Sequence, residues 1–160
     1  MLARDRDIRI IQLIFDLVLL LCFIGSCAAQ DPKINVNDLA NTLYTELSFE
    51  DQLTETNDDM IAFLYGVSEE DVVESKVYIS AGATTEEIAI FRCSSKEAVQ
   101  RITEAAENRL ASQRTSVQSY KLEELSRLED AVLRIEGTYV ILCVSNDHDG
   151  AQKIIDNALK

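Results

Sequence analysis

Apolar residues recur at three- and four-residue spacing in four stretches of the chain, which is the spacing that places them on one face of a helix. Residues suited to helix ends stand at the borders of these stretches. The stretches run from Asn37 to Leu47 and over about 58–65, 95–119 and 147–159. The residues suited to helix ends are Asn37, Ser94 with Glu97, and Asp147 at N-termini, and Gly66 at a C-terminus.

Four other stretches have the two-residue period of strands or are apolar throughout. Residues 76–81 and 131–136 alternate between apolar and polar side chains, whereas 87–93 and 139–144 are apolar on both faces. The two apolar stretches are typical of strands at the centre of a sheet. Residues 120–130 fit either a continued helix or a loop held by three leucines.

The resulting element order is α-α-β-β-α-β-β-α, which indicates the α+β class. Two hairpins, turned at Gly82–Thr85 and at Gly137-Thr138, predict one four-stranded antiparallel sheet with the two apolar strands at its centre. Helices on one face of this sheet would complete a two-layer sandwich. A domain of about 130 residues buries enough surface to fold without a metal or a disulfide.

The N-terminal residues carry a different pattern. Three arginines within the first nine residues precede a mostly apolar run over 10–24, which ends in Ile24-Gly25-Ser26-Cys27. A basic segment, an apolar stretch and small residues before a cleavage point are typical of an export signal. The last four residues resemble the lipobox of bacterial lipoproteins. By this resemblance, Ile24, Gly25 and Ser26 precede the cleavage point, and Cys27 is the cysteine that receives the lipid.

This interpretation divides the chain into three parts. We expect a signal peptide with a cleavable helix at 1–26, a lipidated cysteine and tether at 27–36, and a single domain at 37–160. The protein would then be held by its lipid at the extracytoplasmic face of the cell membrane. An uncleaved membrane anchor and a cytosolic protein are the alternatives.

The charge of the chain excludes one class of partner. Its 160 residues include 15 basic and 28 acidic side chains, for a formal net charge of −13. A nucleic-acid backbone is held by clustered Lys and Arg, so we expect no nucleic-acid partner. The single histidine is too few for a histidine-rich metal site, and we expect no metal or other cofactor.

The acidic excess is concentrated between residues 34 and 75, which hold eleven acidic side chains and no Lys or Arg. Such a surface could bind a basic protein, bind Ca²⁺ or Mg²⁺ loosely, or keep an exported protein soluble. The sequence around Asn57-Asp58-Asp59 is not an EF-hand loop. The candidate contact face comprises Glu50, Asp51, Asp58, Asp59, Glu69, Glu70 and Asp71.

Common catalytic motifs are absent from the sequence, and we assign no catalytic residue. Glu86 and Glu87 follow a turn of small residues, but adjacent strand residues point to opposite faces, which favours a structural role. His148 lies between two aspartates at a predicted helix start, where helix capping is the simpler interpretation. Cys93 and Cys143 could form a disulfide outside the cytosol or be two small buried hydrophobes.

Four short stretches carry a resemblance to a known group of proteins. They are Leu64–Val67, Gly82–Phe91, Glu107–Leu110 with Gln113, and Gly137–Val140. At these residues the chain resembles the small lipoproteins of clostridia and their relatives that carry a domain of unknown function. The resemblance spans about 37–159 and implies export, lipid anchoring and an α+β domain, but no activity, substrate or catalytic residue.

The sequence therefore predicts a non-enzymatic, membrane-tethered binding module whose acidic region contacts a basic protein of the cell envelope. Two alternatives stay open: a protein that binds a small ligand or a divalent cation, and a hydrolase with an unrecognised site. The sequence predicts neither the identity of the partner, nor the biological process, nor the oligomeric state.

Overall fold

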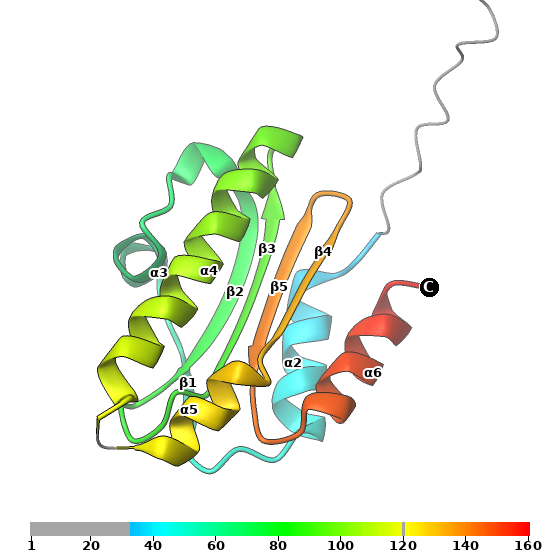
Figure 1. Cartoon of the computed structure of the whole chain (residues 1–160). Coiled ribbons are helices and arrows are strands. Elements are labelled where there is room, and N and C mark those ends of the chain that lie inside the picture. Colours follow the sequence, from blue (N-terminus) through cyan, green and yellow to red (C-terminus); the bar gives the residue numbers. More distant parts are fainter. Residues whose placement is uncertain (1–32, 120) are drawn as a thin grey trace, which may run out of the picture. The chain divides into compact units, whose positions relative to one another are not determined.

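The computed structural model describes residues 33–119 and 121–160. Within these residues, five strands form one antiparallel sheet in the order β1-β2-β3-β5-β4 (Figure 1). The two strands that are apolar on both faces, β3 and β5, lie at its centre as predicted, and the α+β class is confirmed. The strands are β1 (Leu53–Glu55), β2 (Val72–Ser80), β3 (Glu87–Cys93), β4 (Val132–Glu136) and β5 (Tyr139–Val144).

Helices cover both faces of the sheet (Figure 1). One face carries α2 and α6, and the other carries α3, α4 and α5. The helices are α2 (Val36–Glu46), α3 (Asp58–Tyr65), α4 (Lys96–Val117), α5 (Leu122–Glu129) and α6 (His148–Ala158), and a 3₁₀ turn, η1 (Glu69–Asp71), precedes β2.

The predicted two-layer sandwich with four strands was wrong in two respects. The described residues form five strands, because β1 lies between α2 and α3, and the helices form two layers rather than one. The second layer follows from the composition of β3. Ala89 and Phe91 belong to the core beneath α4, and Ile88 and Ile90 belong to the core beneath α2. A strand that is buried on both faces needs a covering layer on each.

Some helix ends were predicted correctly, and others were predicted one or two residues away from their observed positions. Gly66 ends α3 with a φ of 65°, as expected of a C-terminal glycine. Asn35, rather than Asn37, caps α2 and accepts a hydrogen bond from the N–H of Asp38 at 3.1 Å. Ser95, rather than Ser94, caps α4. Each cap satisfies an N–H that the helix itself leaves unpaired.

Two residues on the N-terminal side of the predicted domain boundary pack into the core. Ile34 and Val36, which we placed in the tether, are buried in the core beneath α2. The predicted signal peptide, the lipobox residues Ile24, Gly25 and Ser26, and the lipidation site Cys27 lie outside the described residues. Among the helices that are described, none is long and apolar enough to cross a membrane.

Candidate functional site

Three glutamates are buried at the end of the sheet where β2 turns into β3. Glu86 immediately precedes β3, Glu87 is the first residue of β3, and Glu124 comes from α5; none is more than 2% exposed. A buried carboxylate is costly unless it accepts hydrogen bonds or meets a positive charge. The partners of each glutamate therefore decide whether it is available for chemistry.

Glu86 connects the segment before β1 to the loop between β2 and β3. Its carboxylate accepts hydrogen bonds from the N–H groups of Glu50 at 2.9 Å and Asp51 at 3.0 Å. It also accepts one from the hydroxyl of Thr84 at 3.0 Å. Because both oxygens are occupied by donors from the protein itself, this carboxylate holds two loops together.

Glu87 connects β3 to α3 and α4. It accepts hydrogen bonds from the hydroxyl of Tyr65 at 2.5 Å, from Arg109 at 3.0 and 3.1 Å, and from the side-chain amide of Gln113 at 3.1 Å. Burial, and then the charge of Glu87, raise the pKa of Tyr65 well above its ordinary value. The phenol therefore stays protonated and acts as a hydrogen-bond donor.

Glu124 forms the third connection, together with Arg127. It accepts hydrogen bonds from the N–H and hydroxyl of Thr85 at 2.7 and 2.8 Å and from Arg127 at 2.5 Å. Burial opposes ionisation of Glu124, but the bonds from Thr85 and Arg127 outweigh it and lower the pKa of the carboxyl. Arg127 also contacts Glu50 at 2.8 Å and Asn146 at 2.8 Å.

We name Glu86, Glu87, Glu124 and Arg127 the buried carboxylate cluster. Glu86 and Glu87 share no hydrogen-bond partner, in keeping with the opposite directions of adjacent strand residues. The arrangement is that of structural connections rather than of a carboxylate pair flanking one bond. Sequence reasoning missed Glu124 and Arg127, because a Glu and an Arg three positions apart also occur on exposed helix faces.

A small pocket lies beside this cluster. It has a volume of about 170 Å³ and is lined by Gly82–Thr85, Arg109, Gln113 and Lys121, among others. The side-chain carbonyl oxygen of Gln113 is buried there without a hydrogen-bond partner. Ligand pockets usually measure about 300 Å³ or more, so this one suits water or a very small molecule.

His148 and the two cysteines do not form a site in the structure. The Nδ1 atom of His148 lies 2.6 Å from the carbonyl oxygen of Asp130, and Asp147 caps α6 as expected. Cys93 and Cys143 are free, and they lie in the cores on opposite faces of the sheet. Burial raises the pKa of Cys93 to about 11 and that of Cys143 to about 12. Within the described ranges, no three His, Cys, Asp or Glu side chains are grouped to hold a metal ion.

The seven acidic residues of the candidate contact face fall into two groups. Asp71 is buried and forms an ion pair with Arg101 at 2.6 Å, which lowers the pKa of Asp71. Asp51 accepts hydrogen bonds from Ser80 at 2.6 Å and from the N–H of Ala81 at 3.1 Å. With Glu50 bound to Arg127, these three acidic residues hold the domain together. Their contacts within the domain distinguish them from the other four residues of the predicted contact face.

The remaining four acidic residues are exposed, and we name them the α3–η1 acidic surface. Among the residues that the structure describes, none of the four forms an ion pair. Asp58 and Asp59 begin α3, where the helix dipole favours negative charge. Glu69 and Glu70 lie in η1. The α3–η1 acidic surface comprises Asp58, Asp59, Glu69 and Glu70.

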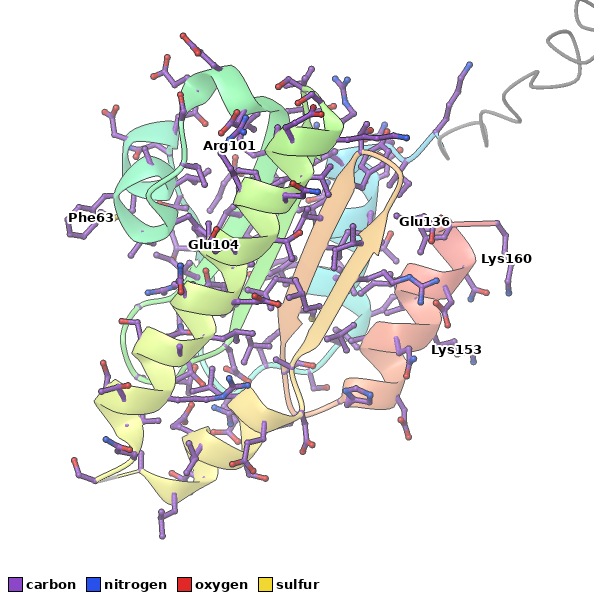
Figure 2. The ribbon with its side chains drawn as sticks, turned by 45° about the horizontal axis from the view of Figure 1, so that its top comes forward. Phe63, Arg101, Glu104, Glu136, Lys153 and Lys160 are labelled. Carbon is purple, nitrogen blue, oxygen red and sulfur yellow. The ribbon has the colours of Figure 1, made fainter. Side chains whose placement is uncertain are left out.

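A groove of about 420 Å³ runs between α3 and the outer edge of β2. Its apolar lining includes Ile61 and Val67, and Asp58 and Glu69 bring carboxylates to it. Glu74 also lines the groove, but its carboxylate forms an ion pair with Arg92 at 3.3 Å. Phe63 is 81% exposed and points from α3 into solvent, away from α4 (Figure 2). The groove therefore joins apolar surface and negative charge at one side of the sheet.

Residues 45–145 match the family described as Domain of unknown function (DUF4358). The chain belongs to this family. The match includes both the buried carboxylate cluster and the groove between α3 and β2. No curated protein and no solved structure gives a match to the chain. The DUF4358 match concerns the domain, so the narrower resemblance to clostridial lipoproteins stays a prediction.

Proposed function

We propose that this DUF4358 protein is a non-enzymatic, membrane-tethered module that binds a positively charged protein outside the cytoplasm. One observation carries the proposal: the four carboxylates of the α3–η1 acidic surface are exposed and have no ion pair among the described residues. Uncompensated charges of one sign attract a partner of the other sign and accelerate its association.

The roles of the other acidic side chains support this assignment. The buried glutamates use their oxygens on donors of the protein itself, and Asp71, Asp51 and Glu50 do the same. Of the described acidic residues that line the groove, Asp58 and Glu69 have no ion pair, whereas Glu74 is paired with Arg92 at 3.3 Å. A binding role therefore fits the geometry better than hydrolysis by a carboxylate pair.

The tether is proposed from the N-terminal sequence. The basic segment, the apolar run and the lipobox-like ending at Cys27 fit export followed by lipid attachment. A partner on the same membrane or in the neighbouring envelope would then meet a domain that is tethered to that membrane. Tethering raises the effective concentration of such a partner without requiring tight binding.

The binding role is tested by crosslinking in intact cells. In a variant with Asp58→Asn, Asp59→Asn, Glu69→Gln and Glu70→Gln, we expect capture of a positively charged partner to fall at least about tenfold. The matched control neutralises four other exposed glutamates, namely Glu104, Glu107, Glu123 and Glu129. Equal loss in both variants, or capture that raised salt does not weaken, would contradict the proposal.

The tether is tested separately by mass spectrometry of the mature N-terminus. We expect a lipid-modified Cys27 as the first residue, and we expect Cys27→Ala to prevent the modification. A full-length, unmodified chain in the soluble fraction would remove the membrane tether from the proposal and leave the binding role to be judged by the crosslinking.

A further inference from the structure

The outer edge of β2 is only partly covered by β1. The register pairs Leu53 with Ser80 and ends at Glu55 with Tyr78. One residue later, the N–H of Thr56 donates to the carbonyl oxygen of Val77 at 3.0 Å, and the chain then turns into α3. In the described part of the chain, no strand follows residues 72–76 along this edge.

The open part of the edge presents backbone groups. The backbone N–H and C=O groups of successive residues in an antiparallel strand point alternately to its two edges. The backbone groups of Ser75 therefore point to the same edge as those of Val77. The carbonyl of Val77 is occupied by Thr56, whereas no described strand lies opposite Ser75. The strand has a bulge between Val72 and Glu74, and Val73 within this bulge is 52% exposed. An exposed edge of this kind is a template for one more strand.

The groove lies along this open edge. Val72–Ser75 form one wall, and α3 forms the other with Ile61 and Ala62. Its volume of about 420 Å³ lies in the range that accommodates several side chains. Alternate side chains of an added strand would point into this apolar lining, and the others would face away from α3.

We propose that the groove binds an extended segment of a positively charged protein, which adds to the edge of β2 as a further strand. Its apolar side chains would enter the groove, and its Lys or Arg side chains would meet Asp58 and Glu69. The sign of the partner's charge rests on the proposed function, whereas the open edge and the groove are independent of it. Backbone hydrogen bonds would supply affinity, and side-chain pockets would supply specificity.

Charge decides between a partner segment and a second copy of this chain. Two copies that paired edge to edge would bring two acidic regions together, because residues 34–75 contain no Lys or Arg in either copy. Like charges directly opposite each other destabilise paired strands. A basic segment instead neutralises the carboxylates at the groove.

The test measures binding of an eight-residue peptide of alternating Lys and Val to the full chain in detergent, by calorimetry. A peptide with Glu in place of Lys is the charge control. Two further peptides carry backbone N-methyl groups on either all Lys or all Val residues, which removes the N–H groups from one edge of the strand or from the other. We expect one methylated peptide to lose at least about tenfold in affinity and the other to keep binding, because an added strand uses one edge.

Variants of the protein locate the site. Ser75→Pro removes the N–H at the open edge, where proline is compatible with a strand, and we expect it to abolish binding; Ser75→Ala should bind normally. Asp58→Asn with Glu69→Gln should weaken binding at least about fivefold. Asp38→Asn with Glu46→Gln, an equal charge change on α2, should not.

The outcomes separate this inference from the proposed function. Equal binding of both methylated peptides, or normal binding by a folded Ser75→Pro variant, would overturn strand addition. If the Ser75→Pro variant does not fold, binding of the methylated peptides to the wild-type chain still tests strand addition. The Lys–Val peptide could fail to bind while crosslinking still captures a partner that depends on the α3–η1 acidic surface. This result would overturn the proposal that the groove binds an extended segment, and it would leave the proposed function in place.

Discussion

The buried carboxylate cluster and the α3–η1 acidic surface use the same chemical group for opposite purposes. Glu86, Glu87 and Glu124 are enclosed and accept hydrogen bonds from Tyr65, Arg109, Arg127 and backbone N–H groups. The four acidic residues of the surface are exposed and have no ion pair among the described residues. A carboxylate whose partners are all internal contributes to stability, whereas one without partners is available to another molecule.

The difference follows from position in the fold rather than from residue type. Glu86 and Glu87 lie where a central strand begins, so protein surrounds them on every side. Asp58 and Glu69 lie at the outer edge of the sheet, where β1 ends early. Substitutions in the two regions should therefore affect different measurements.

The largest loss of stability is expected for Arg127→Met. This change leaves Glu124 and Glu86 buried without their positive neighbour, and breaking a buried pair costs about 3–5 kcal/mol. Urea unfolding at pH 7, followed by circular dichroism, measures the loss. The control is Arg134→Met, whose ion pairs with Glu136 and Asp156 are exposed and 3.7 Å long, and which should cost about 0–1 kcal/mol. Similar losses in both variants would contradict the distinction.

Tyr65→Phe should lower the free energy of unfolding by less. The ring stays in place, but Glu87 loses its 2.5 Å hydrogen bond from the phenol, and hydrogen bonds to charged groups contribute about 1.5–3 kcal/mol. Tyr78→Phe is the matched control, because the hydroxyl of Tyr78 donates to Asn41 at the surface. We expect the control to cost about 0.5 kcal/mol in the same urea experiment.

Much of the secondary structure was predictable because its periodicity is regular. The bounds of α3, β3 and β5 were predicted to within a residue, since each combines apolar periodicity with a clear end signal. The strand β1 was missed because Leu53–Glu55 is too short to show a two-residue period. The second helical layer was also missed, although two strands that are apolar on both faces indicate it.

The candidate sites were less predictable, because their contacts join distant segments. Glu124 accepts hydrogen bonds from Thr85, which is 39 residues away, and nothing near Glu124 indicates that contact. The run of acidic residues was visible in the sequence. Which of these residues bind other groups of the domain, and which have no ion pair, was not. Asp71 and Glu70 are neighbours, yet only Asp71 meets Arg101. The tertiary structure determines which carboxylates have a hydrogen-bond or ion-pair partner.

Acid should reveal the contribution of Glu124. Its pKa in the folded protein lies below the ordinary value of 4.5, so its stabilising effect is complete above pH 4.5 and is lost as the pH falls through the folded pKa. We expect the free energy of unfolding to fall more steeply below about pH 4.5 in the wild type than in Glu124→Gln. Glu123→Gln, an exposed neighbour, should follow the wild type. Parallel curves for all three proteins would show that Glu124 is not coupled to folding.

The smallest effect on stability is expected when the α3–η1 acidic surface is neutralised by Asp58→Asn, Asp59→Asn, Glu69→Gln and Glu70→Gln. Loss of two charges at the start of α3 costs a few tenths of a kcal/mol each, and relief of repulsion among the four acidic residues compensates. The free energy of unfolding should stay within about 1 kcal/mol of the wild type. Added salt should stabilise the wild type more than the variant, because it screens the same repulsion. A loss above about 2 kcal/mol would mean that these carboxylates hold the domain together, as the buried ones do, and that they are not free for a partner.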